Sequence, residues 1–309
     1  MTDLRPLPSL PSAATPGKPD TAGSAFSGST GDACPAPPQV TFTQRDEREL
    51  TRAVLLLERT SLAERISAML GGPVHHLICC LPTSLQNGLS AAVRKSLCQA
   101  LDITLMTLGR PCKKSTNWFH KTLVTCSGAA GGAFGGAALL LELPMATCLM
   151  LRSIAEIARE QGEDLNQVEA RIACFEVFAL GGPDGEDDRT GLGYFTVRRA
   201  LTFEASRATR LLVAGLSDDA APALARLVET VAVRYGIVAQ EKMAAQLVPV
   251  IGALGGATLN YLFMTHFQAM ATGHFIIRRL ERTYGKYPVL MHYHQTLAML
   301  EGRQGCVRG

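Results

Sequence analysis

The chain has 309 residues, which is enough for one or two domains, and 47% of them are hydrophobic while only 18% are charged. Its net charge of +3 is too small for a nucleic-acid-binding protein, and no basic stretch carries interleaved aromatic residues for base stacking. The nine cysteines are scattered, odd in number and never in Cys-x-x-Cys spacing, which argues against a disulfide scaffold or a zinc ribbon.

Residues 1–42 form a tail that is rich in Pro, Ser, Ala, Gly and Thr and has scarcely any large apolar side chain. Such a segment cannot bury enough surface to offset the entropy of ordering it, so we predict a disordered N-terminal tail. Its first ten residues lack the apolar run of a signal peptide. Together with the scattered cysteines, which suit reduced thiols, this predicts a cytoplasmic protein.

A folded region is predicted to begin near Thr43, which has the character of a helix N-cap because Asp46 and Glu47 follow it in the first turn. An amphipathic helical pattern then continues until Gly71-Gly72-Pro73 interrupts it. Apolar residues at helical spacing predict a further helix over residues 84–108. The sequence has no run of alternating β-branched residues, so the predicted fold class is all-α, a helical bundle.

Two long stretches that are almost free of charge contain an internal repeat. Residues 122–151 carry a single charge, Glu142, and residues 243–277 carry none. The phrase Gly-Ala-Phe-Gly-Gly-Ala-Ala-Leu at residues 132–139 matches Gly-Ala-Leu-Gly-Gly-Ala-Thr-Leu at residues 252–259, with a constant offset of 120. We therefore predict two pseudo-equivalent halves.

Glycines at four-residue spacing mark both stretches. This spacing places residues on one face of a helix, and each glycine inside a helix costs about 1 kcal/mol relative to alanine. Close approach of a second helix backbone would offset that cost, so we predict two glycine-zipper helical segments, with flexible loops as the alternative. The helix-packing residues predicted in this way are Gly128, Gly132, Gly136, Gly252 and Gly256.

The two apolar stretches suit either the core of a soluble bundle or a shallow insertion into a membrane. The mean hydropathy of the chain, +0.13, lies between those two classes. The first stretch is too short for two crossings, and Pro144 is expected to break it. Basic residues such as Arg152 and Lys242 flank the stretches, which suits a hairpin with both ends on the cytoplasmic side. The predicted location is therefore cytoplasmic, with peripheral association or shallow insertion at the inner membrane left open.

Two sets of residues in and beside the apolar stretches form a recognisable pattern. The first set comprises Glu142-Leu143-Pro144, Arg152-Ser153-Ile154-Ala155-Glu156-Ile157, Gly162 and Asp164. The second set comprises Pro249-Val250-Ile251-Gly252-Ala253, Gly256-Ala257, Asn260, Phe263, Ala271, Phe275, Arg278 and Leu280. Together they resemble the signatures of the EcsC family. We accordingly divide the chain into the tail at 1–42, an EcsC-like helical domain at 43–290 and a C-terminal extension at 291–309. The resemblance implies a helical fold and a loose link to ABC-type membrane transport, and it implies no particular reaction.

Polar residues inside and beside the apolar stretches are the candidates for a functional site. An unpaired polar group is costly in apolar surroundings, and Arg152 and Glu156 stand one helical turn apart, where they can pair. A cluster between the two halves could bind a head group or a substrate, or it could simply fix the register of the helices. This candidate polar cluster comprises Glu142, Arg152, Glu156 and Asn260.

The sequence contains no recognisable catalytic, cofactor-binding or metal-binding motif, and its histidines are isolated from other potential ligands. We therefore predict a non-catalytic helical protein, without cofactor or metal, that associates with membrane lipid or with a membrane complex such as an ABC-type transport system. A soluble enzyme that uses the candidate polar cluster is the alternative, and a soluble scaffold is a third hypothesis. No nucleic-acid partner is expected, and the oligomeric state stays open.

Overall fold

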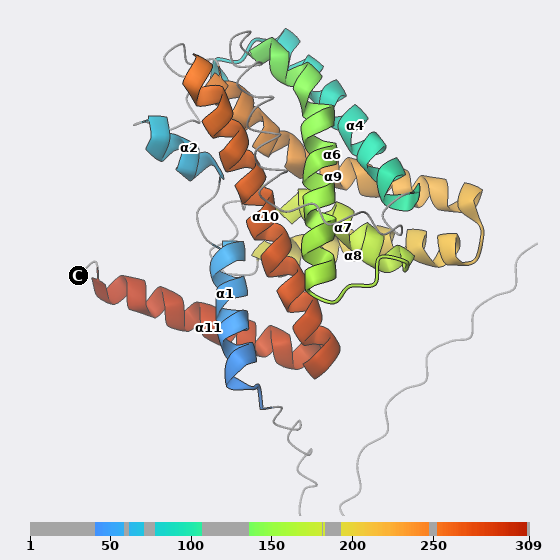
Figure 1. The fold of residues 1–309 in the computed structure, drawn as a ribbon, viewed down its shortest axis with the longest axis vertical. Coiled ribbons are helices and arrows are strands. Elements are labelled where there is room, and N and C mark those ends of the chain that lie inside the picture. Colours follow the sequence, from blue (N-terminus) through green and yellow to red (C-terminus); the bar gives the residue numbers. More distant parts are fainter. Residues whose placement is uncertain are drawn as a thin grey trace, which may run out of the picture. The chain divides into compact units, whose positions relative to one another are not determined.

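Every regular element in the part of the chain that the structure describes is helical, which confirms the predicted all-α fold class. The structure is a computed structural model, and it describes residues 41–58, 62–70, 78–106, 136–180, 182, 193–246 and 252–307. The helices, drawn in Figure 1, are α1 (Gln44–Glu58), α2 (Leu62–Leu70), α4 (Thr83–Met106), α6 (Gly136–Glu160), α7 (Val168–Leu180), α8 (Gly193–Val213), α9 (Ser217–Gln246), α10 (Gly252–Tyr284) and α11 (Lys286–Val307).

Helix α1 begins as the sequence predicts. The hydroxyl oxygen of Thr43 accepts a hydrogen bond from the backbone N–H of Asp46 at 3.2 Å, which is the N-cap interaction. Asp46 also accepts a hydrogen bond from the hydroxyl of Tyr284 at 2.7 Å, so the start of α1 is tied to the end of α10. The hydrogen bonds from Thr43 and Tyr284 lower the pKa of the Asp46 carboxyl group.

The amphipathic pattern that follows Thr43 belongs to two helices, α1 and α2. Leu50 and Val54 on α1 and Ile66 on α2 are all buried, so the apolar stripe faces the core as its periodicity indicates. The predicted helix over residues 84–108 is confirmed as α4. Gly71-Gly72-Pro73 lies outside the described residues.

Helix α7 lies at the centre of the bundle, where it packs against α4, α6, α8, α9 and α10 (Figure 1). From Ile172 to Leu180 every residue of this helix is buried. A helix that is apolar around its whole circumference is stable only when neighbours cover all of its sides. Glu176 is the single charged residue within that buried run.

The second apolar stretch supplies much of the core between residues 259 and 277. Phe263, Phe267 and Phe275 of α10 are fully buried. The ring of Phe267 lies 5.6 Å from that of Phe178 on α7 and 5.5 Å from that of Tyr235 on α9, measured between centroids. No helix in the described part of the chain has both the length and the apolar character needed to cross a bilayer.

Helix α6 corrects the expectation that Pro144 breaks the first stretch. The helix runs without interruption from Gly136 to Glu160 and contains Pro144. A proline inside a helix loses one backbone hydrogen bond and costs about 3 kcal/mol. Tertiary packing offsets that cost, because Leu143 and Ala146 beside the proline are buried in the core.

Several predictions concern residues that the structure does not describe. Gly128 and Gly132, and the tail up to residue 40, lie outside the described residues. Gly136 and Gly252 are the first residues of α6 and α10, and Gly256 is buried within α10. The predicted extension at 291–309 is continuous with the residues before it, because α11 runs from Lys286 to Val307.

Candidate functional site

Two of the four residues predicted to form the polar cluster are in direct contact. The side-chain amide of Asn260 on α10 donates a hydrogen bond to Oε1 of Glu142 on α6 at 2.5 Å. The same oxygen lies 3.3 Å from Nζ of Lys242 on α9. The Lys242 side chain is fully buried, and its ammonium group stands 4.7 Å from the centroid of the Phe263 ring. Three helices therefore meet around one carboxylate.

This buried cluster suits a structural role. Burial lowers the pKa of Lys242, while the neighbouring carboxylate of Glu142 raises it. The second carboxylate oxygen of Glu142 is buried and accepts no hydrogen bond from any described residue. A buried ion pair of this kind is expensive to separate and helps to fix how the helices pack. Lys242, which the sequence suggested as a cationic flank of an apolar stretch, is thus an internal residue.

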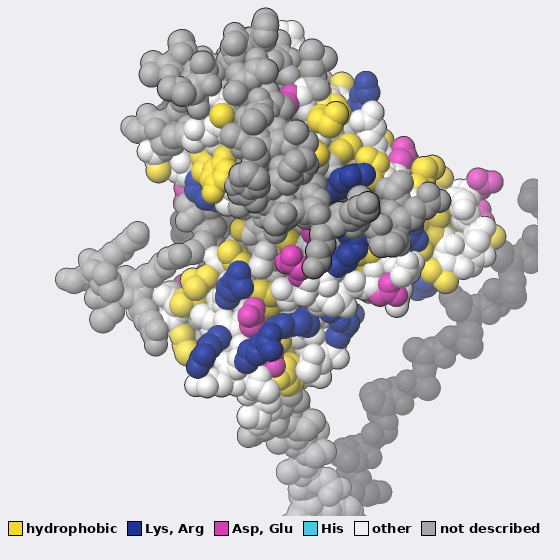
Figure 2. Space-filling view, in the orientation of Figure 1, with side chains coloured by type: hydrophobic (Ala, Val, Ile, Leu, Met, Phe, Trp, Pro, Cys, Tyr) yellow, Lys and Arg dark blue, Asp and Glu magenta, His cyan; other side chains and the backbone are white. Residues whose placement is uncertain are grey.

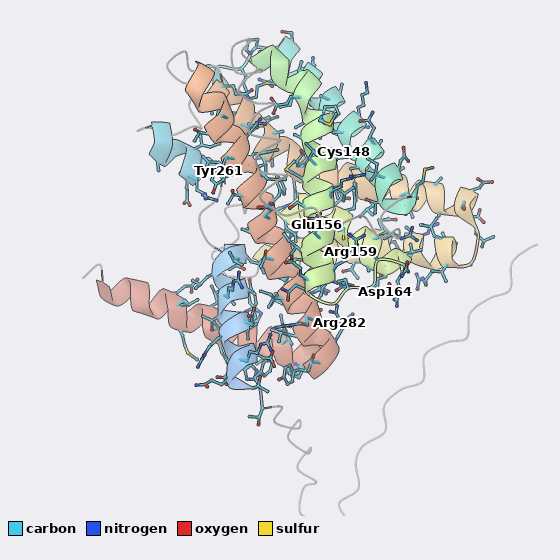
Figure 3. All side chains as sticks on the ribbon, viewed as in Figure 1. Cys148, Glu156, Arg159, Asp164, Tyr261 and Arg282 are labelled. Atoms are coloured by element: carbon cyan, nitrogen blue, oxygen red, sulfur yellow. The ribbon has the colours of Figure 1, made fainter. Side chains whose placement is uncertain are left out.

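Arg152 and Glu156 do not join that cluster. They follow Glu142 on the same helix by ten and fourteen residues, which corresponds to about 15 Å and 21 Å along the axis. Arg152 is exposed, and Glu156 is half-buried toward the C-terminal end of α6, where Figure 3 labels it. The four candidate residues therefore do not form one site.

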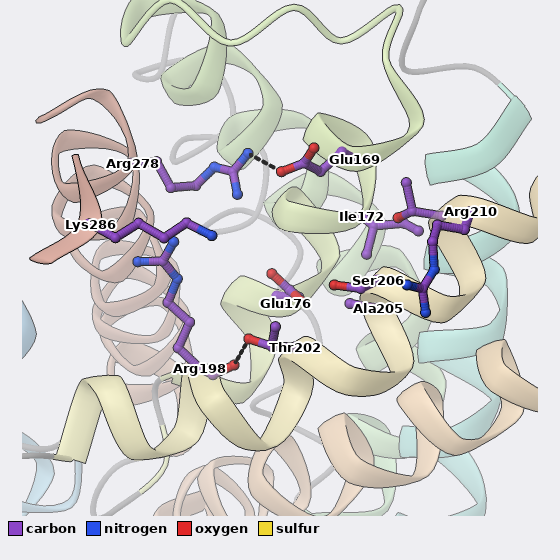
Figure 4. Close-up of a pocket in the computed structure, with 11 residues that line it drawn as sticks. Glu169, Ile172, Glu176, Arg198, Thr202, Ala205, Ser206, Arg210, Arg278 and Lys286 are labelled. Atoms are coloured by element: carbon purple, nitrogen blue, oxygen red, sulfur yellow. Dashed lines mark hydrogen bonds and ion pairs between the residues drawn. The ribbon is translucent and has the colours of Figure 1, made fainter. Parts of the chain in front are cut away.

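A different polar site lies between α7 and α8, in a pocket of about 290 Å³ (Figure 4). Its lining combines acidic, basic and hydroxyl side chains, which is uncommon for a crevice between buried helices. Glu169, Ile172 and Glu176 form one wall, Arg278 and Lys286 close one end, and Arg198, Thr202, Ala205, Ser206, Thr209 and Arg210 form the other wall.

The local sequence of α8 explains its wall of the pocket. Arg198, Thr202, Ser206 and Arg210 recur at every fourth position, so they lie along one face of the helix. The opposite face carries apolar residues such as Leu201 and Ala208, which are buried. The four-residue spacing therefore places the polar side chains in a stripe along α8, and the packing of α8 against α7 encloses this stripe.

Two arginines of the pocket are held in place by carboxylates outside its lining. Both terminal nitrogens of Arg198 donate to Glu281, at 2.8 Å and 2.6 Å, in a bidentate pair. Nε of Arg278 donates to Glu163 at 2.9 Å. Because these pairs are formed within the protein, both guanidinium groups are oriented before any ligand arrives.

Like Arg210, Lys286 is a cation of the pocket for which the described residues provide no such carboxylate. It lies at the start of α11, and no ion pair joins it to a residue within the described ranges. Figure 4 shows the nitrogen ends of Lys286, Arg198 and Arg278 directed toward the same end of the pocket. Such a group of cationic donors can bind an oxyanion.

Glu176 is the unusual acid of this site. Its side chain is buried in the α7 wall, and burial raises its pKa to about 7, although the charges of Arg278 and Arg198 oppose that rise. No hydrogen bond or ion pair joins its carboxyl group to another residue of the described chain. The group therefore changes its charge near neutral pH while facing a polar pocket.

The polar network continues from the pocket into the core. One terminal nitrogen of Arg198 lies 3.5 Å from the hydroxyl of Tyr194, which in turn lies 3.0 Å from Nδ1 of His274. Burial and the charges of two arginines hold the pKa of His274 well below its usual value, so this imidazole is neutral. No group of three potential metal ligands occurs among the residues that the structure describes.

Sequence reasoning missed this pocket, although two of its signals are visible. The four-residue spacing from Arg198 to Arg210 predicts a polar stripe, and Glu176 is a lone charge in the apolar run Cys-Phe-Glu-Val-Phe-Ala-Leu. No local sequence pattern predicts that Lys286 lines the pocket, because the tertiary fold alone brings α11 to this site.

Comparison with known proteins identifies one family. The model of the EcsC protein family matches residues 46–280, a range that begins within α1 and ends within α10. No curated protein and no solved structure matches the chain significantly. The match covers every pocket residue except Lys286.

Proposed function

This chain belongs to the EcsC protein family, and we propose that it is a non-catalytic binding protein that holds a phosphate-like oxyanion in the pocket between α7 and α8. One observation carries the proposal: Lys286 lines a pocket that already contains two oriented arginines, and no described carboxylate forms an ion pair with it.

The charges at this end of the pocket favour an anion. Arg198 pairs with Glu281, and Arg278 pairs with both Glu163 and Glu169, so these pairs contribute little net positive charge. Lys286 then adds a positive charge that a bound anion can neutralise. Arginine and lysine donors together with hydroxyl groups are the usual partners of phosphate oxygens.

A phosphate group can reach the pocket as a soluble ion or as the head group of a lipid. The second source agrees with the predicted peripheral association at the cytoplasmic side of a membrane. Figure 2 shows Lys and Arg side chains gathered where α1 and the end of α10 lie, and Figure 3 labels Arg282 there. Basic side chains of this kind favour an anionic lipid surface. Association with a membrane complex such as an ABC-type transport system stays a prediction.

The enzyme alternative has weaker support. Its candidate residues separate into a buried cluster around Glu142 and two side chains further along α6. Lys242 is fully buried, and Glu142 is only 9% exposed, so substrate has no described route to them. A binding role for the α7–α8 pocket is the simpler proposal.

Binding is tested by calorimetric titration of the full chain with inorganic phosphate and by sedimentation with phosphatidylcholine vesicles that contain or lack phosphatidic acid. Lys286→Ala should weaken phosphate binding about tenfold, because it removes one charge-assisted contact. Arg199→Ala is the matched control, since Arg199 is exposed on α8 and does not line the pocket.

The two probes separate the sources of the anion. Binding of both phosphate and phosphatidic acid vesicles, each weakened by Lys286→Ala, supports a head group ligand. Binding of phosphate alone supports a soluble ligand. If wild type binds neither probe, or if Lys286→Ala and Arg199→Ala bind equally well, the proposed function is wrong.

We further propose that the glycine phrases are a repeated packing device, in which α6 and α10 approach closely. Both phrases lead into helices, α6 from Gly136 and α10 from Gly252, and these two helices are in contact. The hydrogen bond between Glu142 and Asn260, 118 residues apart, joins them just beyond the phrases. Gly256→Leu should therefore lower the melting temperature, and a melt identical to that of wild type would refute close packing there.

A further inference from the structure

We infer that Glu176 is a hydrogen-bond donor of the oxyanion pocket, so that the protein takes up one proton when it binds the anion. This inference rests on the proposed function, because it concerns the regulation of that same site. It assigns Glu176 a binding role that depends on pH.

The position of Glu176 supports a neutral carboxyl group. Its side chain is 9% exposed and lines the pocket from the middle of α7. The arginines nearest to it are engaged elsewhere, Arg198 with Glu281 and Arg278 with Glu163. Glu176 therefore forms no ion pair with any residue of the described ranges, although positive charges lie nearby. Without such a partner to stabilise the carboxylate, the buried carboxyl group can be protonated.

Charged groups face Glu176 from every element around the pocket. They are Glu169 on α7, Arg198 and Arg210 on α8, Arg278 on α10 and Lys286 on α11. Burial, and to a smaller extent the carboxylate of Glu169, raise the pKa of Glu176 to about 7 against the charges of Arg278 and Arg198. A bound anion adds a second negative neighbour, which favours the protonated form still more strongly.

Protonation also supplies a donor. An ionised carboxylate only accepts hydrogen bonds and would repel an oxyanion, whereas a protonated carboxyl group has one O–H to donate. Anion binding and proton binding consequently strengthen each other, since coupling between two sites is reciprocal. When binding of the anion is coupled to the uptake of one proton by Glu176, the affinity falls about tenfold for each pH unit above the pKa that Glu176 has in the free protein.

Sulfate is the appropriate probe, because its charge stays constant between about pH 6 and about pH 9, whereas phosphate itself titrates near neutrality. We would measure sulfate affinity of the full chain across this range. Titrations in two buffers of different ionisation enthalpy give the number of protons taken up. For wild type we expect uptake of close to one proton and a steep loss of affinity above pH 7.

Glu176→Gln isolates the residue, because the amide keeps the shape and a donor but cannot titrate. Its sulfate affinity should stay within a few-fold of the low-pH wild-type value and should not depend on pH. Glu160→Gln is the matched control, since Glu160 is exposed at the end of α6 and does not line the pocket, and it should keep the wild-type slope.

Each other result overturns the inference. Sulfate binding by wild type at about pH 8 without proton uptake excludes a protonated Glu176 in the complex, because the free carboxyl group is ionised at that pH. This measurement requires no variant. A folded Glu176→Gln protein that keeps the pH slope, or that no longer binds, also contradicts the proposed role. In those cases the proposed function survives if Lys286→Ala still weakens binding, and it fails if wild type binds neither phosphate nor sulfate.

Discussion

Gly273 on α10 lies beneath the side chain of Leu57 on α1, and replacing this glycine with alanine tests how tightly the two helices pack. A Cβ atom at Gly273 would stand 2.6 Å from Cγ of Leu57 and 3.0 Å from its Cδ2 atom. These distances are well inside van der Waals contact, so α1 or the Leu57 side chain must move. Gly236 on α9 is the contrasting case, since a Cβ atom there meets nothing within 4 Å.

The magnitudes follow from two opposing effects. Alanine stabilises a helix interior by up to about 1 kcal/mol relative to glycine, and overpacking a close contact costs about 1 to 3 kcal/mol. Gly273→Ala should therefore destabilise the protein by up to about 2 kcal/mol. Gly236→Ala should stabilise it by about 1 kcal/mol, because only the first effect operates there.

Urea denaturation followed by circular dichroism measures both changes in the free energy of unfolding. The double variant Gly273→Ala/Leu57→Ala removes the clash, so its destabilisation should be smaller than the sum of the two single changes. If Gly273→Ala is as stable as Gly236→Ala, α1 does not pack against α10 at this point and the reasoning is wrong.

Three further predictions concern buried polar groups. Lys242→Met leaves the carboxylate of Glu142 buried without its cation and should lower the free energy of unfolding, measured by urea denaturation, by about 3 to 5 kcal/mol. Adding Glu142→Gln should recover much of this loss. Folding raises the pKa of Glu176 from 4.5 to about 7, so the free energy of unfolding of wild type should fall by up to about 3 kcal/mol relative to that of Glu176→Gln as the pH rises through this interval. Equal stabilities of the two proteins at all pH values would contradict the shift. Tyr235→Phe removes a 2.7 Å hydrogen bond to the hydroxyl of Thr147 and should lower stability by about 1 kcal/mol, whereas an unchanged denaturation midpoint would show that this bond contributes nothing.

The candidate polar cluster shows how far the sequence leads toward a site. Glu142 and Asn260 were identifiable because a polar residue in an apolar stretch needs a partner, and they prove to be each other's partners. Lys242 was not identifiable as the third member, since its position at the end of an apolar stretch equally suits an exposed flank. Arg152 and Glu156 were included for their spacing, but they lie about 15 Å and 21 Å further along the axis of α6 than Glu142.

Local structure was determined by the sequence alone. The N-cap at Thr43, the extent of α4 and the absence of strand patterns depend on neighbours within a few residues, so they can be read before any packing is known. Pro144 marks the limit of that approach, because its effect on α6 depends on the buried contacts around it.

The assembly of the pocket was decided only by the tertiary structure. Glu176, Arg198, Arg278 and Lys286 come from four different helices, α7, α8, α10 and α11. Helical periodicity specifies which face of α8 is polar, but it does not specify which helix covers that face. The pKa of Glu176 likewise follows from the burial and charges that packing creates, and no property of its own segment determines it.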